Sequence, residues 1–305
     1  MIKNLSPKSY AGYAPAKLNL FFEIQEKRPD GYHDVCSLCC PVGLFDTILW
    51  ESQESPEIVL ECQSGKTGKI LTEIPTNSDN LVVKAVEAVR KRCGISTGCR
   101  LRLLKRIPSQ AGMGGGSSDA AIAIRLADHA WGLQLSRDEM IAIGSEIGSD
   151  VPLFFMNGMS LGYGRGEQLE AIKTNVRLDF VIVKPSEGIS TAEAFRKCTP
   201  EQYINRRTPE QLVRGLHEGN MKRIASGMFN RLETTARTMS GQVRGLAEKF
   251  SWLDCAAHQM TGSGTAYFAL CRHDKHARQL ANRLRSLCVG DVFVVNSLAD
   301  ANSLG

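Results

Sequence analysis

The chain has 305 residues, of which 43% are hydrophobic and 23% are charged, and its formal net charge is +5. These values exclude a collagen-like, largely disordered or disulfide-stapled miniprotein, and the length suits two domains with a large apolar core. The net charge is small and the basic residues are scattered, so we expect no nucleic-acid partner.

The sequence carries no recognisable targeting or membrane-spanning segment. Residues Met1–Pro15 lack a long apolar core behind basic residues, and the apolar runs Val35–Phe45 and Val151–Gly164 are too short to cross a bilayer. Ten cysteines without a secretion signal are typical of thiols in a reducing compartment. We therefore expect a cytoplasmic protein without a membrane partner.

Three cysteines lie close together early in the chain. Cys36, Cys39 and Cys40, with His33 upstream, resemble a fragment of a zinc site. No second cysteine pair completes a tetrahedral set, and the other interpretation is that they are small buried hydrophobic side chains.

The first half of the chain is predicted to mix strands and helices. In the first strand, Leu18, Leu20, Phe22 and Ile24 share one face, while Lys17, Asn19 and Phe21 point to the other. The predicted strands are Ala14–Gln25, Asp46–Glu51, Glu57–Cys62 and Cys99–Leu104. The predicted helices are Asn80–Arg92, a helix from Ser117 or Ser118 to Trp131, Ser136–Ile147 and one turn over Val151–Phe155.

Capping residues set the expected helix boundaries. Ser78 or Asp79 is expected to cap the first helix, and Ser117 or Ser118 the second. Gly132 ends the second helix. Ser136 and Glu139 have the spacing of a capping box.

The second half, from about Ala171, follows a similar mixture. The predicted strands are Leu178–Val183, Cys255–Met260, Ala266–Cys271 and Asp291–Asn296. The predicted helices are Ser190–Lys197, Pro209–His217, Met221–Met228, one longer helix Ala236–Phe250, and His276–Leu287. The elements lack a regular βαβ order, which favours an α+β fold. We expect two domains, residues 1–170 and 171–305.

A basic cluster precedes the most glycine-rich part of the chain. Arg100, Arg102, Lys105 and Arg106 alternate with leucines, which is typical of a solvated strand face. The alternative is a patch that attracts an anionic ligand.

A glycine-rich loop lies between a predicted strand and a predicted helix. Such a loop directs backbone N–H groups and the positive end of a helix at one point, where a phosphate binds. It is neither a Walker A nor a dinucleotide-binding fingerprint, and the other interpretation is a tight connection without a ligand. The loop consists of Pro108, Ser109, Gln110, Ala111, Gly112, Met113, Gly114, Gly115, Gly116, Ser117 and Ser118.

Two further segments contain residue types suited to a site. Met260–Thr265 carries Gly262 and Gly264 between two short apolar strands, and it either approaches a ligand or forms a plain turn. Asp150, in the segment Gly148–Pro152, either caps the next helical turn or is a catalytic carboxylate.

Together these segments resemble the GHMP small-molecule kinases over about residues 14–296. The motifs are Pro15–Leu20 (PAKLNL) with Arg28–His33 (RPDGYH), then Pro108–Asp119 (PSQAGMGGGSSD) with Gly148–Pro152 (GSDVP), then Met260–Gly264 (MTGSG). The Arg28–His33 segment resembles the branch that uses ATP to phosphorylate the 2-hydroxyl of 4-diphosphocytidyl-2-C-methyl-D-erythritol. The resemblance implies an N-terminal domain like the second domain of ribosomal protein S5 and a ferredoxin-like C-terminal domain.

The resemblance also implies residue roles. The glycine-rich loop matches the loop that binds the ATP phosphates in these kinases. Asp150 matches their catalytic base, and Lys17 matches the lysine that stabilises negative charge. Without the resemblance, Lys17 would be interpreted as a surface charge. Asn19 matches the contact to the erythritol hydroxyls. Tyr32, His33 and Phe195 match the cytidine site, although His33 would alternatively be structural and Phe195 a core residue.

Three points stay open at this stage. Mg²⁺ is expected with ATP, but no protein ligand is assigned, and Asp119 and Glu146 are candidates only. Ser109–Ala111 and Thr265–Ala266 depart from the usual motifs. The alternatives are another GHMP kinase and a catalytically silent nucleotide-binding protein, against which the presence of both Lys17 and Asp150 argues. The partner is expected to be a small-molecule substrate, and the protein a monomer or homodimer.

Overall fold

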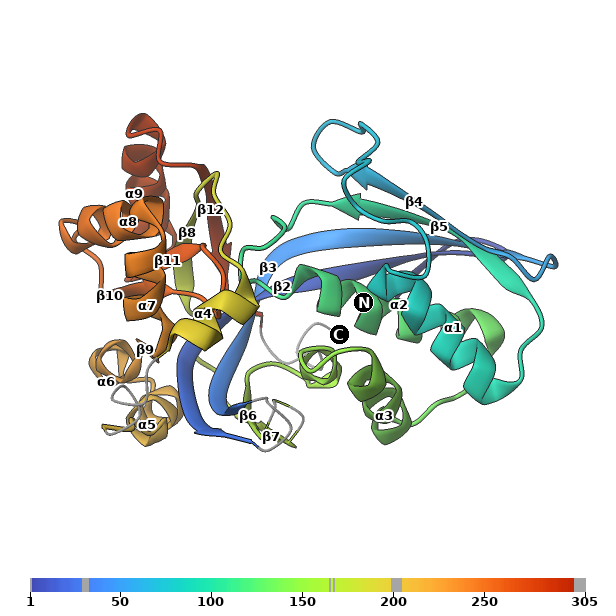
Figure 1. Ribbon diagram of the computed structural model, residues 1–305, viewed down its shortest axis with the longest axis horizontal. Coiled ribbons are helices and arrows are strands. Elements are labelled where there is room, and N and C mark those ends of the chain that lie inside the picture. Colours follow the sequence, from blue (N-terminus) through green and yellow to red (C-terminus); the bar gives the residue numbers. More distant parts are fainter. Residues whose placement is uncertain (1, 29–32, 165, 167, 199–204, 299–305) are drawn as a thin grey trace. The chain divides into compact units, whose positions relative to one another are not determined.

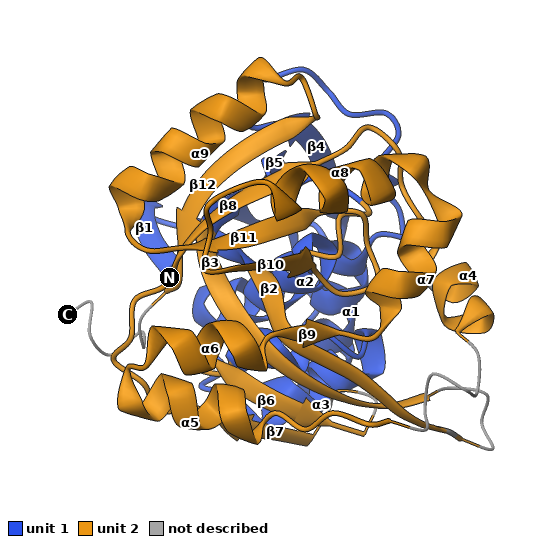
Figure 2. Ribbon diagram, turned by 90° about the vertical axis from the view of Figure 1, so that its left-hand side faces the viewer, with its two compact units in different colours: residues 1–16, 44–109, 114–155 blue, residues 17–43, 110–113, 156–305 orange. Residues whose placement is uncertain are grey.

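A computed structural model describes residues 2–28, 33–164, 166, 168–198 and 205–298 (Figure 1). The chain forms two compact units, shown in different colours in Figure 2. Unit 1 comprises residues 1–16, 44–109 and 114–155, and unit 2 comprises residues 17–43, 110–113 and 156–305. Two long strands, β2 (Ser9–Lys27) and β3 (His33–Gln53), contribute to both units. The domain boundary expected at residue 170 stays a prediction.

The sheet of unit 1 contains the strands predicted there and one more. The end of β3 pairs antiparallel with β5 (Gly98–Lys105), which pairs parallel with β4 (Ile58–Ser64). β1 (Ile2–Ser6) pairs antiparallel with the start of β2. β1 was not predicted because four of its five residues are exposed, so its sequence lacks an apolar face.

The helices of unit 1 are α1 (Leu81–Cys93), α2 (Gly115–Trp131), α3 (Arg137–Ile147) and the short 3₁₀-helix η1 (Pro152–Phe155). Helices α1 and α2 lie side by side (Figure 1). Helix α2 packs closely on β2, because a Cβ atom at Gly12 would lie 2.4 Å from Cγ2 of Ile122. This contact holds the helix that follows the glycine-rich loop.

Two predicted helix caps are wrong and two are confirmed. Asn80 caps α1, its side chain accepting a hydrogen bond from the Val82 amide at 2.9 Å, in place of Ser78 or Asp79. Helix α2 starts after Gly114 at φ 70° with no side-chain cap, so Ser117 and Ser118 lie inside it. The Ser136–Glu139 capping box of α3 and the end of α2 at Gly132 are both present.

Unit 2 contains a four-stranded antiparallel sheet in the order β10-β11-β8-β12. Its strands are β8 (Asp179–Lys184), β10 (Ala257–Met260), β11 (Tyr267–Cys271) and β12 (Asp291–Asn296), with α9 (Asp274–Ser286) between the last two. Numbered in chain order, the strands run 2-3-1-4, which is the expected ferredoxin-like order. Alternate residues such as Val181, Val183 and Ala269 form one core cluster with apolar residues of α8 (Gly241–Ser251) and α9.

Unit 2 also holds shorter elements. The predicted single helix Ala236–Phe250 is wrong: α7 (Leu232–Met239) and α8 are separate, because Ser240 is extended and its hydroxyl caps α8 by accepting from the Val243 amide. The hairpin β6 (Ser160–Tyr163) and β7 (Gln168–Ala171) was not predicted. The remaining elements are α4 (Thr191–Lys197), α5 (Glu210–Glu218), α6 (Met221–Gly227) and β9 (Phe229–Asn230).

Two sequence expectations bear on membranes and metals. In the described part of the chain, no helix is both long and apolar enough to cross a bilayer. Cys36, Cys39 and Cys40 are buried along β3, as their interpretation as small hydrophobic side chains predicted. Among the described residues, no group of three or more histidine, cysteine, aspartate or glutamate side chains could hold a metal.

Candidate functional site

The two ends of the glycine-rich loop belong to unit 1. The first intrahelical hydrogen bond of α2 runs from the Ser118 amide to the Gly114 carbonyl at 2.9 Å. The amides of Gly115, Gly116 and Ser117 therefore open the helix without an acceptor inside it. Together with the positive end of a helix, such amides form an anion-binding position.

A buried charge cluster lies at both ends of this loop. The Lys105 ammonium donates hydrogen bonds to the carboxylates of Asp46 and, at 2.6 Å, of Asp119. Asp46 in turn accepts hydrogen bonds from the amides of Arg106 and Ile107, which directly precede the loop, whereas Asp119 lies in α2, which follows it. The expectation that Lys105 lies on a solvated strand face is wrong, because only 11% of its side chain is exposed.

The cluster carries two carboxylates against one ammonium. Burial raises the pKa of Asp119 to about 7, and the neighbouring Lys105 charge opposes that rise. The second Asp119 oxygen, Oδ1, and the Ser118 hydroxyl are buried and have no hydrogen-bond partner. Two unpartnered oxygens at the start of α2 are suited to a cation that accompanies a phosphate.

The raised pKa predicts a pH-dependent stability. Between the ordinary pKa of 3.8 and about 7, the folded chain holds a proton on Asp119 that the unfolded chain has lost. The associated stability is complete at low pH and is lost as the pH rises through 7. From pH 5 to pH 8, wild-type protein should lose about 3 kcal/mol of unfolding free energy relative to Asp119→Asn. Denaturant titrations of both proteins at both pH values measure this difference. Equal changes of the unfolding free energy in wild type and Asp119→Asn would contradict the raised pKa.

The middle of the loop, residues 110–113, lies in unit 2 against the third motif. Gly112 has φ 76°, and a Cβ atom there would lie 2.2 Å from the Thr261 carbonyl oxygen. A Cβ atom at Gly264 would lie 2.1 Å from the Gly112 nitrogen. The two glycine-rich segments therefore pack backbone to backbone, which no residue with a side chain permits at these positions.

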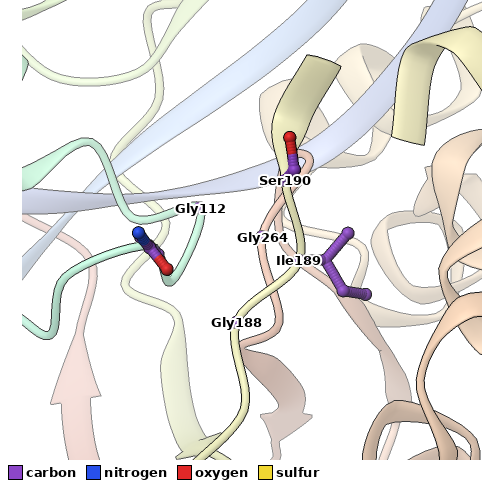
Figure 3. Close-up of a pocket in the computed structure, with 6 residues that line it drawn as sticks. Gly112, Gly188, Ile189, Ser190 and Gly264 are labelled. Atoms are coloured by element: carbon purple, nitrogen blue, oxygen red, sulfur yellow. The ribbon is translucent and has the colours of Figure 1, made fainter. Parts of the chain in front are cut away.

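A cavity of about 380 Å³ lies at this junction in unit 2 (Figure 3). Its lining supplies a carboxamide, a hydroxyl and glycine backbone, with one apolar side chain. This lining suits uncharged hydrogen-bonding contacts to a polar ligand. The lining residues are Gln110, Gly112, Gly188, Ile189, Ser190 and Gly264.

Lys17 lies on β2 in unit 2 and is 5% exposed, so its interpretation as a surface charge is wrong. Its ammonium donates a hydrogen bond to Oδ1 of Asn19. Its backbone amide donates to the Met113 carbonyl at 3.0 Å, which ties the strand to the glycine-rich loop. The sequence prediction that Lys17 and Asn19 share a strand face agrees with this contact.

Asp150 lies in unit 1, in the turn between α3 and η1. The turn is closed by a hydrogen bond from the Val151 amide to the Gly148 carbonyl at 3.1 Å. Pro152 begins η1, as the sequence predicted. The Asp150 side chain is half-buried, and the role of its carboxylate stays a proposal.

The expected aromatic site is partly described. The rings of His33 and Phe195 are stacked, with centroids 5.5 Å apart, and Phe22 meets the Phe195 ring edge-on at 6.2 Å. Phe195 also packs against the core of unit 2, so the two interpretations of this residue are compatible. Tyr32 lies outside the described residues.

The comparisons with known proteins agree with these motifs. Residues 80–158 match the GHMP kinases N terminal domain family, and residues 212–290 match the GHMP kinases C terminal family. A 4-diphosphocytidyl-2-C-methyl-D-erythritol kinase of Exiguobacterium sibiricum is 34% identical over 287 residues, covering 94% of this chain and 97% of that protein. A Streptococcus equi subsp. zooepidemicus protein, provisionally given the same name, is 39% identical over 285 residues, covering 93% and 98%. This chain belongs to the 4-diphosphocytidyl-2-C-methyl-D-erythritol kinase family.

Solved structures confirm the expected α+β fold of two domains. A crystal structure of 4-(cytidine 5′-diphospho)-2C-methyl-D-erythritol kinase matches with a TM-score of 0.79 at 27% identity, covering 95% of this chain and 100% of that one. An L. major mevalonate kinase matches with a TM-score of 0.75 at 16% identity, covering 99% of each chain, and shows the fold alone. The protein is thus an ATP-dependent GHMP small-molecule kinase.

Sequence reasoning missed two residues that shape this kinase site. Asn230 donates hydrogen bonds to the carbonyls of Met260 and Gly262, at 2.8 and 2.9 Å, and so holds the third motif. Asp46 was predicted only as the start of a strand, although it joins the charge cluster. No local pattern marks either residue, because their partners lie far away along the chain.

Proposed function

We propose that this protein transfers the γ-phosphoryl group of ATP to the 2-hydroxyl of 4-diphosphocytidyl-2-C-methyl-D-erythritol, in the non-mevalonate route to isoprenoid precursors. The observation that carries the proposal is similarity to kinases of this substrate over more than 90% of the chain, at 31–39% identity. The motifs that contain Lys17 and Asp150 are both present, which supports an active enzyme.

In the proposed reaction, the glycine-rich loop binds the ATP phosphates through the backbone amides at the start of α2 and the glycines of residues 112–116. Asp150 accepts the proton of the substrate 2-hydroxyl, and the resulting alkoxide oxygen attacks the γ-phosphorus as the bond to ADP breaks. Lys17 stabilises the negative charge on the attacking oxygen. Positioning and charge stabilisation supply most of the catalysis in such transfers.

Mg²⁺ is part of the proposal. Mg²⁺ commonly binds through one or two protein oxygens together with phosphates and water. The unpartnered Oδ1 of Asp119 and hydroxyl of Ser118 fit this requirement, and they would hold the ion beside the phosphates. When bound, Mg²⁺ neutralises phosphate charge. Glu146 is a poorer candidate, because it is exposed and lies 3.8 Å from Arg92.

The substrate contacts complete the proposal. Asn19 contacts the erythritol part, while Tyr32, His33 and Phe195 form the cytidine site, where stacking on an aromatic ring contributes about 1–3 kcal/mol per base. We also propose a cytoplasmic location, because all ten cysteines are thiols. We further propose that the protein is a monomer or homodimer and that the boundary between its two domains lies at residue 170.

Phe195→Ala should mainly weaken binding of the cytidyl substrate. We expect KM for that substrate to rise roughly 5- to 100-fold, because a stacked base loses its aromatic partner. The KM for ATP should change little. Steady-state kinetics with each substrate varied in turn measure both values, and Phe268→Leu, a core change in β11, controls for packing losses. Unchanged kinetics would remove Phe195 from the site.

Acceptor specificity tests the proposed function. Purified protein should release ADP with the cytidyl substrate and not with mevalonate or homoserine. Activity with either of the latter alone would identify another GHMP kinase. ATP binding with no turnover of any acceptor would identify a catalytically silent nucleotide-binding protein.

A further inference from the structure

A buried hydrogen-bond network surrounds the side chain of Asn19. Its Nδ2 donates to the hydroxyl of Ser37 at 2.7 Å and to the sulfur of Cys39 at 3.3 Å. Its Oδ1 accepts from the Lys17 ammonium and, at 3.4 Å, from the Thr261 hydroxyl. Both donors of the Asn19 carboxamide and its acceptor are therefore engaged within unit 2.

The network has a fixed direction. An ammonium group can only donate hydrogen bonds, so Lys17 requires the oxygen of Asn19 to face it. The amide nitrogen must then face Ser37 and Cys39, both of which offer an acceptor. All these side chains are at most 6% exposed, so water does not substitute for a lost partner.

Strand geometry explains why Ser37 and Cys39 both accept hydrogen bonds from Asn19. Ser37 and Cys39 are two residues apart on β3 and share one face of it, and β3 neighbours β2 in the sheet. Lys17 and Asn19 have the same spacing on β2. Cys36 and Cys40 lie on the opposite face of β3. The cysteine-rich segment singled out in the sequence thus contributes one sulfur to this network.

The backbone on the other side leaves Asn19 and Lys17 little room to move. A Cβ atom at Gly262 would lie 3.0 Å from Oδ1 of Asn19 and 3.2 Å from the Lys17 ammonium. The Thr261 hydroxyl also accepts the Asn19 backbone amide at 3.0 Å. The carboxamide is therefore enclosed between the third motif and β3.

We propose that Ser37 and Cys39 are positioning residues for phosphoryl transfer. They fix the Asn19 carboxamide, and the carboxamide holds the Lys17 ammonium where the attacking oxygen develops charge. This role rests on the proposed function of Lys17. A displaced charge stabilises the transition state poorly, so loss of either partner lowers kcat more than it changes KM.

The first test is kinetic. Ser37→Ala and Cys39→Val should each lower kcat about 10-fold, with both KM values within about 2-fold of wild type. Ser37→Thr and Cys39→Ser keep an acceptor and should retain most of the activity. Ser160→Ala is the matched control, because Ser160 is a buried serine paired with Cys39 across the sheet, outside the network. It should keep wild-type kcat.

A double-mutant cycle separates positioning from general destabilisation. In a Lys17→Met background, Ser37→Ala should lower kcat less than about 2-fold, since its effect passes through the ammonium that is already missing. An equal loss in both backgrounds would overturn the proposal. So would a wild-type kcat in both Ser37→Ala and Cys39→Val.

A second readout does not depend on activity. The rate of Lys17 acetylation by acetic anhydride, measured by mass spectrometry, should rise in Ser37→Ala and Cys39→Val and stay at the wild-type value in Ser160→Ala. If wild-type protein phosphorylates no acceptor, the proposed function fails, and the acetylation rates still decide whether the network holds Lys17. Equal acetylation rates in wild type, Ser37→Ala, Cys39→Val and Ser160→Ala would overturn the proposed positioning role.

Discussion

An Asp150→Asn variant should bind ATP as wild type does and turn over the cytidyl substrate about 10²- to 10⁴-fold more slowly. The substitution keeps the size and hydrogen-bonding oxygen of the side chain but removes its ability to accept the proton. Asp150 is half-buried in a turn closed by its neighbours, so the change should leave the fold intact. Isothermal titration with an ATP analogue and steady-state kinetics measure the two quantities.

Asp138→Asn provides the control, because Asp138 is an exposed carboxylate in the first turn of α3, close to Asp150 along the chain. It should keep wild-type rates. Turnover by Asp150→Asn within about 3-fold of wild type would show that another group, or water, takes the proton.

Lys17→Met should lower kcat about 10²- to 10³-fold, which is the typical loss when a preorganised charge-stabilising group is removed. Methionine has a similar length but no charge, so it fills the buried space and leaves the developing negative charge without its partner. Some stability should also be lost, because Oδ1 of Asn19 loses the ammonium that donates to it. Single-turnover kinetics at saturating ATP separate the chemical step from binding.

Lys222→Met is a matched control, since Lys222 is an exposed lysine of α6 in the same unit. It should behave as wild type. If Lys17→Met raises only the KM for ATP and leaves kcat unchanged, Lys17 binds the ground state and does not stabilise the transition state.

Local sequence patterns predicted most regular elements. The capping box of α3 and the continuous apolar runs of β8 and β11 are local features, so they identified these elements without any tertiary information. The predictions failed where a single residue changes the backbone. Ser240 interrupts an apolar periodicity that runs on through α7 and α8, and Gly114 turns the chain into α2 with no side-chain cap.

The site was predictable only where its residues are contiguous. The glycine-rich loop is recognisable from the sequence, because clustered glycines directly before a helix are typical of a phosphate-binding loop. The hydrogen-bond network around Lys17 and Asn19 could not be predicted from the sequence. Asn19 meets Thr261 across 242 positions of the sequence and Ser37 across 18, and hydrogen bonds between such distant residues leave no local pattern. Only the fold brings them together.

The most direct measurement of the central claim is phosphorus and carbon NMR of the product formed from ATP and 4-diphosphocytidyl-2-C-methyl-D-erythritol. The proposed reaction yields one new phosphate monoester on the 2-hydroxyl, formed in equal amount with ADP, with the cytidine diphosphate intact. A phosphate on another hydroxyl, cleavage of the diphosphate, or ADP release without a phosphorylated product would contradict it.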